Sequence, residues 1–270
     1  MGFTLLWGKL YDMGAWYEHW FNSPYYHKLY FERDEAEARL CIHRLVRYLK
    51  PQPDSRMLDV ACGRGRHSRM LAEAGFDVTG TDLSPESISY AKQYETEKLH
   101  FYLHDMRLPF WVNFFDYGFN FFTSFGYFAS RREHQAALRS IRNSLKPGGS
   151  LLFDYLNVQY AEAHLRHEEI KIIDDTTFDI HRRQDAGHFY KRILITDVAL
   201  LKPLEFTEKI AKFSLDDFTE MLALQHMQVT DVFGNYDLQA YDTRNTPRMI
   251  VVAKRMAWGF EKVQKSAKTR

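Results

Sequence analysis

Short apolar segments alternate with helical segments between residues 57 and 157, and this alternation limits the possible folds more than any other feature of the chain. Residues 57–61 form an apolar run of strand length, and residues 66–74 follow as a helix with Gly75 placed to cap its C-terminus. Such an alternation indicates βαβ units, and therefore a doubly wound, mostly parallel sheet. Further strands are expected at residues 76–81, 99–103, 117–122 and 151–154, and further helices from Ser84 onward and over residues 131–145.

The pattern changes on both sides of this alternating region. Residues 1–32 are rich in Trp and Tyr, and a helix follows them until Pro51 and Pro53 stop it. After Asn157, four strand-like segments have no helices between them, which indicates an inserted antiparallel layer. These segments are residues 170–173, 177–183, 189–196 and 206–213; a capping-box-like start then opens a helix at Ser214, and the last two strands are expected at 227–232 and 249–253.

The composition excludes several classes of protein. Lys and Arg number 36 against 35 Asp and Glu among 270 residues, so no strong positive field exists and no nucleic-acid partner is expected. Two cysteines, Cys41 and Cys62, make neither a disulfide framework nor a metal cluster. No apolar run approaches the roughly 20 residues of a membrane helix, and no signal peptide is recognisable. We therefore expect a cytoplasmic protein with no membrane partner and no metal.

The segment from Leu58 to Ser68 joins the first strand of the alternating region to its first helix. Gly63 and Gly65 within it allow the backbone to turn tightly and to approach a ligand closely. The helix that follows presents free N–H groups at its N-terminus. Two glycines in a turn are a weak signal when taken alone, so the interpretation depends on the residues around them.

Two acids strengthen the case for a nucleoside site. Asp82 ends the second strand about 20 residues beyond the glycines, where an acid can accept both hydroxyls of a ribose. Asp105 comes just after the third strand, where a carboxylate can accept an adenine amino group. Both acids would lie at the carboxyl ends of neighbouring strands, where open α/β sheets bind their ligands. The joint placement is much harder to obtain by chance than either acid alone.

The details of the loop favour a nucleoside that carries an amino acid over a dinucleotide. A dinucleotide site needs a third glycine, and the corresponding position is Ser68. Asp59 precedes the glycines, and a carboxylate there opposes a phosphate and favours a cation. The amino group of an amino acid is such a cation.

Residues 57–157 resemble the core of the Rossmann-like, class I S-adenosylmethionine-dependent methyltransferases, and their motifs are most similar to those of the glycine N-methyltransferases. The resemblance is carried by Leu58-Asp59-Val60-Ala61-Cys62-Gly63, by Gly75-Phe76 and Val78-Thr79 through Asp82, by Phe115-Asp116 through Ser124-Phe125, and by Leu152-Phe153-Asp154 with Asn157. Outside these motifs the similarity fades.

The resemblance implies how the cofactor, S-adenosylmethionine, is held. Its methionine part would be lined by Asp59, Ala61, Gly63 and Gly65, and its amino group would be received by the backbone of Phe121. The ribose would be bound by Asp82, and the adenine would lie between Leu83 on one side and Asp105 with Met106 on the other. Thr123 would face both the cofactor and the substrate.

The pattern of strands and helices along the chain predicts a domain organisation. One Rossmann-like α/β domain with a seven-stranded, mostly parallel sheet would carry an N-terminal helical cap and an inserted antiparallel β-layer that narrows the entrance. The expected division is a cap or lid at residues 1–50, the cofactor-binding core at 51–157, the inserted layer at 158–213, the C-terminal part of the core at 214–256 and a basic tail at 257–270.

The acceptor side is less specific. Glycine N-methyltransferases carry an arginine at the position of Leu156, and an aliphatic residue cannot grip a substrate carboxylate, so glycine is not expected as the acceptor. Candidate cations elsewhere are Arg33, Arg182 and Arg248. Candidates for substrate contact are Tyr26, Tyr30, Thr123, Tyr127, Asn157 and Tyr236, with Tyr17 and Tyr25 in the same lid; no catalytic residue is identified, and the candidates for a base are Tyr127, His181 and His104.

The sequence therefore predicts a methyltransferase that moves a methyl group to a nitrogen or oxygen of a small molecule by direct in-line displacement. Positioning of this kind can lower a barrier by roughly 7–11 kcal/mol. Two alternatives are a nicotinamide-dependent oxidoreductase on a related fold and a non-catalytic protein that binds S-adenosylmethionine. Ser68 and Asp105 argue against the oxidoreductase, and the oligomeric state stays open.

Overall fold

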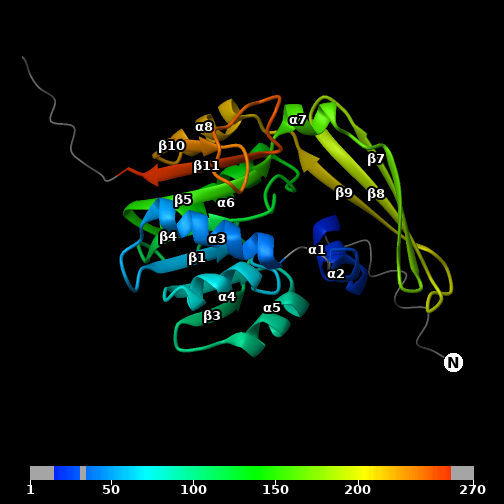
Figure 1. The fold of residues 1–270 in the computed structure, drawn as a ribbon, viewed down its shortest axis with the longest axis horizontal. Helices are drawn as coiled ribbons and strands as arrows, with labels where there is room; N and C mark the ends of the chain where they lie inside the picture. The colour runs from blue at the N-terminus through cyan, green and yellow to red at the C-terminus, as the bar shows by residue number, and fades with distance from the viewer. Residues whose placement is uncertain (1–14, 31–34, 257–270) are drawn as a thin grey trace, which may run out of the picture.

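The computed structural model describes residues 15–30 and 35–256. Its central sheet contains β1 (Arg56–Val60), β2 (Asp77–Asp82), β3 (Leu99–Leu103), β4 (Phe115–Asn120), β5 (Leu145–Leu156), β10 (Met227–Phe233) and β11 (Arg248–Arg255). The strand order is β10-β11-β5-β4-β1-β2-β3, and pairing is parallel from β3 to β5 and antiparallel at β11 and β10. The predicted seven-stranded, mostly parallel sheet is confirmed (Figure 1).

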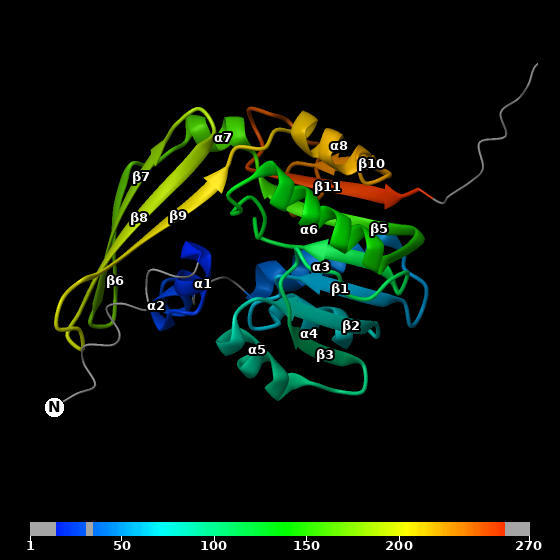
Figure 2. The same cartoon turned by 180° about the vertical axis from the view of Figure 1, so that it is seen from behind.

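Helices cover both faces of this sheet, as the two opposite views show (Figures 1 and 2). On one face lie α3 (Glu35–Leu49), α4 (Arg66–Glu73) and α5 (Pro85–Ala91), followed by the short 3-10 turn η2 (Lys92–Tyr94); on the other lie α6 (Arg131–Ser144) and α8 (Leu215–Ala223). In α3, Cys41, Ile42 and Leu45 recur at helical spacing and are buried against the sheet. A fully buried side chain of this kind stabilises the fold by about 1.5–3 kcal/mol.

Local signals fix where these helices begin. Ser84 accepts the backbone N–H of Ser87 at 3.1 Å and Pro85 occupies the first helical position of α5, as the sequence predicts. Ser214 and Asp217 form the expected reciprocal capping box at the start of α8. Each cap satisfies N–H groups that a helix terminus cannot pair internally, so it sets the direction in which the preceding loop enters the helix.

The inserted layer is a separate antiparallel sheet of β6 (Glu168–Ile173), β7 (Thr176–Gln184), β8 (His188–Asp197) and β9 (Leu204–Ala211). Figure 2 shows it standing beside the central domain, with α1 (Trp16–Phe21) and α2 (Pro24–Leu29) between the two sheets. Trp20 and Leu29 pack with Phe178 and Ile193 in one apolar cluster. The expected antiparallel insertion is confirmed, and its apolar face holds the two N-terminal helices.

Two details of the sequence-based prediction are wrong. The helix α7 (Val158–Ala163) lies between Asn157 and the first inserted strand, where no helix was predicted, because six residues are too few to show a helical period. The fifth strand begins at Leu145 instead of Leu151. Residues 145–149 form an irregular first part of this strand, and their pairing with β4 is out of regular register. There Leu145 pairs with Phe115 and Ser150 with Tyr117, so the glycines absorb the extra residues of β5.

No helix among the described residues is long and apolar enough to cross a membrane. Arg33 and the basic tail at 257–270 fall outside the described residues. The domain boundaries stated above remain our proposal.

Candidate active site

A cavity of about 440 Å³ opens at the carboxyl ends of β1, β2 and β4, a size typical of small-molecule sites. Two sets of residues line it. The strand ends and the loops after them contribute Asp59, Ala61, Gly63, Asp82, Leu83, Asp105, Met106, Phe121 and Thr123, and the opposite wall contains Tyr17, Phe21, Tyr26, His27, Tyr30, Tyr127, Phe128, Glu208 and Ile210. The tertiary structure thus brings every predicted cofactor residue except Gly65 to the lining of one cavity.

The loop after β1 needs its glycines for two different reasons. Gly63 and Gly65 both have positive φ, at +55° and +76°, which side chains rarely adopt. A Cβ atom on Gly65 would lie 2.5 Å from the Phe101 ring, whereas one on Gly63 would meet nothing within 4 Å. Gly65 therefore permits the start of α4 to pack against β3. Gly63 leaves open space in which a ligand can approach the backbone.

Asp82 fastens this loop to the end of β2. Its Oδ2 accepts the backbone N–H of Gly63 and its Oδ1 accepts that of Ser84, both at 2.8 Å. Burial raises the pKa of Asp82, although these hydrogen bonds oppose the shift. Asp82 also lines the cavity, so its carboxylate is placed to accept ribose hydroxyls.

Asp59 lies deeper, with 1% of its surface exposed. Its Oδ2 accepts the Ser68 hydroxyl at 2.6 Å. Burial raises the pKa of Asp59 to about 7, and the negative charge of Asp82 adds to the rise. A cation bound beside Asp59 would reverse this shift by favouring the carboxylate. A carboxylate at this position would attract the positively charged amino group of an amino acid and would repel a pyrophosphate.

The raised pKa of Asp59 predicts a pH-dependent effect of Asp59→Asn. The folded state holds the Asp59 proton up to about pH 7, while the unfolded state loses it near the ordinary value of 3.8. The stability that this proton provides is full below pH 3.8 and is lost as pH rises through 7. Asp59→Asn, which resembles the protonated acid, should raise the melting temperature at pH 8 and change it little at pH 4. Equal shifts at both pH values in thermal melts would contradict this assignment.

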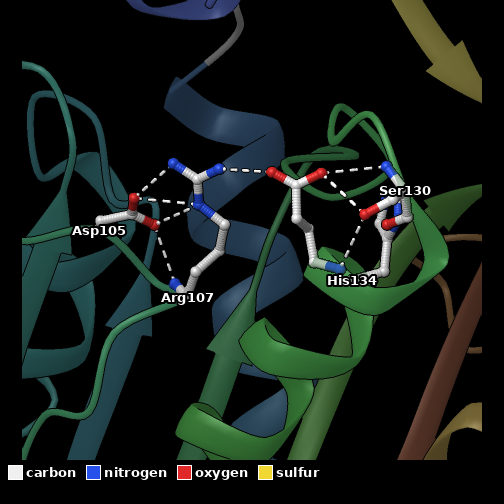
Figure 3. A network of polar contacts seen from close by, with 5 residues as sticks. Asp105, Arg107, Ser130 and His134 are labelled. Carbon is white, nitrogen blue, oxygen red and sulfur yellow. Dashed lines mark hydrogen bonds and ion pairs between the residues drawn. The ribbon is translucent and has the colours of Figure 1, made fainter.

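Asp105 is held by a polar network that joins the loop after β3 to α6 (Figure 3). Arg107 donates from Nη2 to Asp105 Oδ2 at 2.6 Å and from Nη1 to Glu133 Oε1 at 2.8 Å. Glu133 closes the capping box with Ser130. Burial alone would raise the pKa of Asp105, but the hydrogen bonds from Arg107 hold it below its ordinary value. Asp105 is therefore an ionised acceptor in a fixed orientation at the edge of the cavity.

The turn after β4 contains two consecutive residues with positive φ, Phe122 at +56° and Thr123 at +59°. Such non-glycine conformations cost about 1–3 kcal/mol each and persist only where the surroundings enforce them. Asp154 enforces this turn: its Oδ2 accepts the N–H of Phe122 at 2.8 Å and its carbonyl accepts the N–H of Thr123 at 2.9 Å. Its carboxylate also binds Arg248 and accepts the Tyr236 hydroxyl at 2.8 Å.

These contacts change the interpretation of several candidates. Arg248 was considered as a cation for a substrate, yet its guanidinium pairs with buried Asp154 at 2.6 Å. Tyr236 is committed to the same carboxylate, and Asn157 donates to the carbonyls of Asp242 and Thr246; neither lines the cavity. Both tie the segment between β10 and β11 to the end of β5, which sequence spacing does not reveal.

Of the three candidates for a catalytic base, two line the cavity and one does not. His181 lies on β7 with Nε2 3.0 Å from Asp179, outside the residues that line the cavity, and Arg182 beside it pairs with Glu169. His104 and Tyr127 do line it. The Tyr127 hydroxyl donates to the carbonyl of Thr123 at 2.5 Å, so its proton is directed at the protein backbone.

Several residues that line the cavity were not identified from the sequence, and two of them, Glu208 and His27, are titratable and come from the opposite wall. Glu208 comes from β9 and His27 from α2, and burial lowers the pKa of His27 to about 4. Neither belongs to a motif, and only the packing of α1 and α2 on the inserted sheet brings them to the cavity. Within residues 15–30 and 35–256, no three His, Cys, Asp or Glu side chains lie close enough together to hold a metal ion.

Comparison with known proteins identifies the fold and its family. A family model for a methyltransferase domain matches residues 57–149. The putative methyltransferase YqeM of Bacillus subtilis (strain 168) is 35% identical over 212 residues, which cover 70% of this chain and 81% of YqeM. Glycine N-methyltransferase of Rattus norvegicus is 31% identical over 133 residues, covering 43% of this chain and 45% of that enzyme.

A solved structure supports the same fold. The S-adenosylmethionine-dependent methyltransferase from Clostridium acetobutylicum ATCC 824 matches with a TM-score of 0.72 at 17% identity, covering 86% of this chain and 97% of that one. The long match to YqeM, the methyltransferase domain model and the sheet order agree with the cavity at the strand ends. The chain belongs to the class I, Rossmann-like S-adenosylmethionine-dependent methyltransferases.

Proposed function

We propose that this methyltransferase acts on a nitrogen or oxygen atom of a small molecule. One observation carries the proposal: a single cavity joins the glycine loop and Asp82 on one wall to α1, α2 and β9 on the other. A bound donor and an acceptor can therefore meet inside one cavity. Glycine N-methyltransferase, whose name specifies a small amine acceptor, is a relative over the core motifs.

The residues present fit S-adenosylmethionine. Gly63 leaves the open space, Asp82 offers acceptors for the ribose, and buried Asp59 suits the amino group of the methionine part. When bound, the cofactor supplies an electrophilic methyl group on a sulfonium sulfur. The protein's own contribution is to orient the acceptor in line, to exclude water with the aromatic wall, and to fix the turn at Phe122 and Thr123.

The rival nicotinamide assignment has no support at the site. Ser68 stands at the third glycine position and donates its hydroxyl to Asp59, so the loop places a buried acid where a pyrophosphate would need positive charge. A cytoplasmic location and the lack of a nucleic-acid partner stay predictions from the sequence.

Calorimetric titration tests the assignment. S-adenosylmethionine and S-adenosylhomocysteine should both bind to the purified chain, and NADH should not. Methyl transfer to small amines and alcohols then separates an enzyme from a protein that only binds the cofactor. Binding of NADH without either adenosyl ligand would overturn the proposal.

A further inference from the structure

The wall opposite the nucleotide loops is aromatic. We call it the acceptor wall and define it by Phe21, Tyr26, Tyr30, Tyr127 and Glu208. The ring centroids of Phe21 and Tyr26 lie 4.9 Å apart, those of Phe21 and Tyr127 5.4 Å, and those of Tyr26 and Tyr30 5.0 Å. The faces of such rings attract cations electrostatically. A wall of this kind suits an apolar or aromatic body that carries a positive group.

Glu208 is the acidic member of the acceptor wall and is 9% exposed. Its Oε1 accepts hydrogen bonds from Trp20 Nε1 at 2.7 Å and from the Tyr30 hydroxyl at 2.9 Å. Lys191 donates to the same Tyr30 oxygen at 2.5 Å, which directs the hydroxyl proton toward Glu208. The carboxylate is thus held in one orientation by groups from α1, the end of α2 and β8.

The other oxygen of Glu208 remains available. Its Oε2 lies 3.9 Å from Lys191 Nζ, which is longer than a hydrogen bond, and no other described residue donates to it. Burial lowers the pKa of Lys191, while the negative charge of Glu208 opposes that shift. A ligand that can donate a hydrogen bond therefore has a fixed, negatively charged acceptor within the cavity.

We propose that Glu208 recognises the methyl acceptor through its amino group, so that the acceptor is a primary or secondary amine on an apolar or aromatic body. This inference rests on the proposed function of the same cavity. The acceptor nitrogen donates an N–H to Glu208 Oε2, and the acceptor body packs on the rings of Phe21, Tyr26 and Tyr127.

The charge balance of the reaction agrees with this role. The amine must be unprotonated when it reacts, because an ammonium has no lone pair. Its nitrogen then uses the lone pair to form the new bond to carbon, the carbon–sulfur bond of the sulfonium donor breaks, and the electron pair of that bond stays on the neutral thioether. The nitrogen gains a positive charge and then loses one N–H proton. Glu208 stabilises that charge as it develops and is an acceptor for the proton that leaves. An acceptor with a carboxylate or phosphate at this position would be repelled.

Binding of a matched pair of probes tests the proposal without requiring turnover. Protein saturated with S-adenosylhomocysteine is titrated in a calorimeter with 2-phenylethylamine and with 2-phenylethanol, which differ only in the donor group. The wild type should bind the amine about tenfold or more tightly than the alcohol, and Glu208→Gln should remove that preference, since a hydrogen bond to a charged group is lost. The affinity for the alcohol should change less than that for the amine, because the alcohol carries no charge and donates only one hydrogen bond.

Glu205→Gln is the matched control. Glu205 lies on the same strand, has an exposed carboxylate paired with Arg192 at 2.7 Å, and should leave both affinities unchanged. Equal binding of the two probes to the wild type, or of neither, overturns the proposal, and this comparison needs no variant that could misfold. If the protein binds S-adenosylhomocysteine but does not prefer the amine, only this inference is refuted. If the protein does not bind S-adenosylhomocysteine, the proposed function is refuted.

Discussion

Arg248→Met is expected to lower the free energy of unfolding by about 3–5 kcal/mol, because it leaves the Asp154 carboxylate buried without its cation. The Arg248 guanidinium donates from Nε to Asp154 Oδ1 at 2.7 Å, and the residue Asp154 is only 1% exposed. The same guanidinium donates from Nη2 to Thr123 Oγ1 at 3.0 Å. Loss of this support also loosens the turn with positive φ at the cavity, so cofactor affinity should fall as well. Urea denaturation measures the first effect.

Arg192→Met provides the comparison for this variant. Arg192 makes an equally short ion pair, with Glu205 at 2.7 Å, but both side chains are about half exposed. Exposed pairs contribute about 0–1 kcal/mol, so the expected change is small. Combining Asp154→Asn with Arg248→Met should recover part of the loss, because no buried charge then remains. Similar losses for the two arginine variants would show that Asp154 does not depend on Arg248.

Asp82→Ala is expected to weaken binding of S-adenosylhomocysteine by about 3 kcal/mol, on the order of 100-fold, because two hydrogen bonds to a charged group are lost. The substitution also frees the N–H groups of Gly63 and Ser84, which Asp82 now holds at 2.8 Å each. The loop that approaches the ligand then loses its fixed position. Isothermal titration of the purified variant measures the change directly.

Asp77→Ala tests whether this effect is local. Asp77 begins the same strand, at the end away from the cavity, and its partly exposed side chain pairs with Arg56 at 3.6 Å. It should leave the affinity unchanged. Asp82→Asn keeps one acceptor oxygen and should fall between the wild type and Asp82→Ala. If Asp82→Ala binds S-adenosylhomocysteine with full affinity, Asp82 does not bind the ribose, and the ribose must lie in another part of the cavity.

The core of this protein could be predicted from its sequence because its signals are local. Gly63, Gly65 and Asp82 lie within about 20 residues of one another, and a βαβ unit of that length fixes which strand ends meet. The order and direction of the parallel strands follow from the same alternation. The agreement is weaker at the strand β5, where glycines after a helix look like a loop but continue the sheet.

The acceptor side could not be predicted in the same way, because its contacts join distant segments. Asn157 and Tyr236 were expected in the cavity. Instead, Asn157 donates to a backbone carbonyl in the segment between β10 and β11, and Tyr236 donates to Asp154 on β5. Glu208 was not singled out, since a lone acid in an alternating strand usually faces solvent. Only the packing of Trp20 against the inserted sheet brings Glu208 to the cavity.

The sequence by itself determined the doubly wound fold, the loop that approaches a ligand and the acids at neighbouring strand ends. These features depend on backbone conformation and on periodicity over short stretches of chain, which residue types specify directly. The tertiary structure alone decided which face of the inserted sheet meets α1 and α2, how Asp154 and Arg248 hold the turn after β4, and which charged group lies on the acceptor wall. Those contacts span up to 188 residues, and no local pattern encodes a pairing at such a separation.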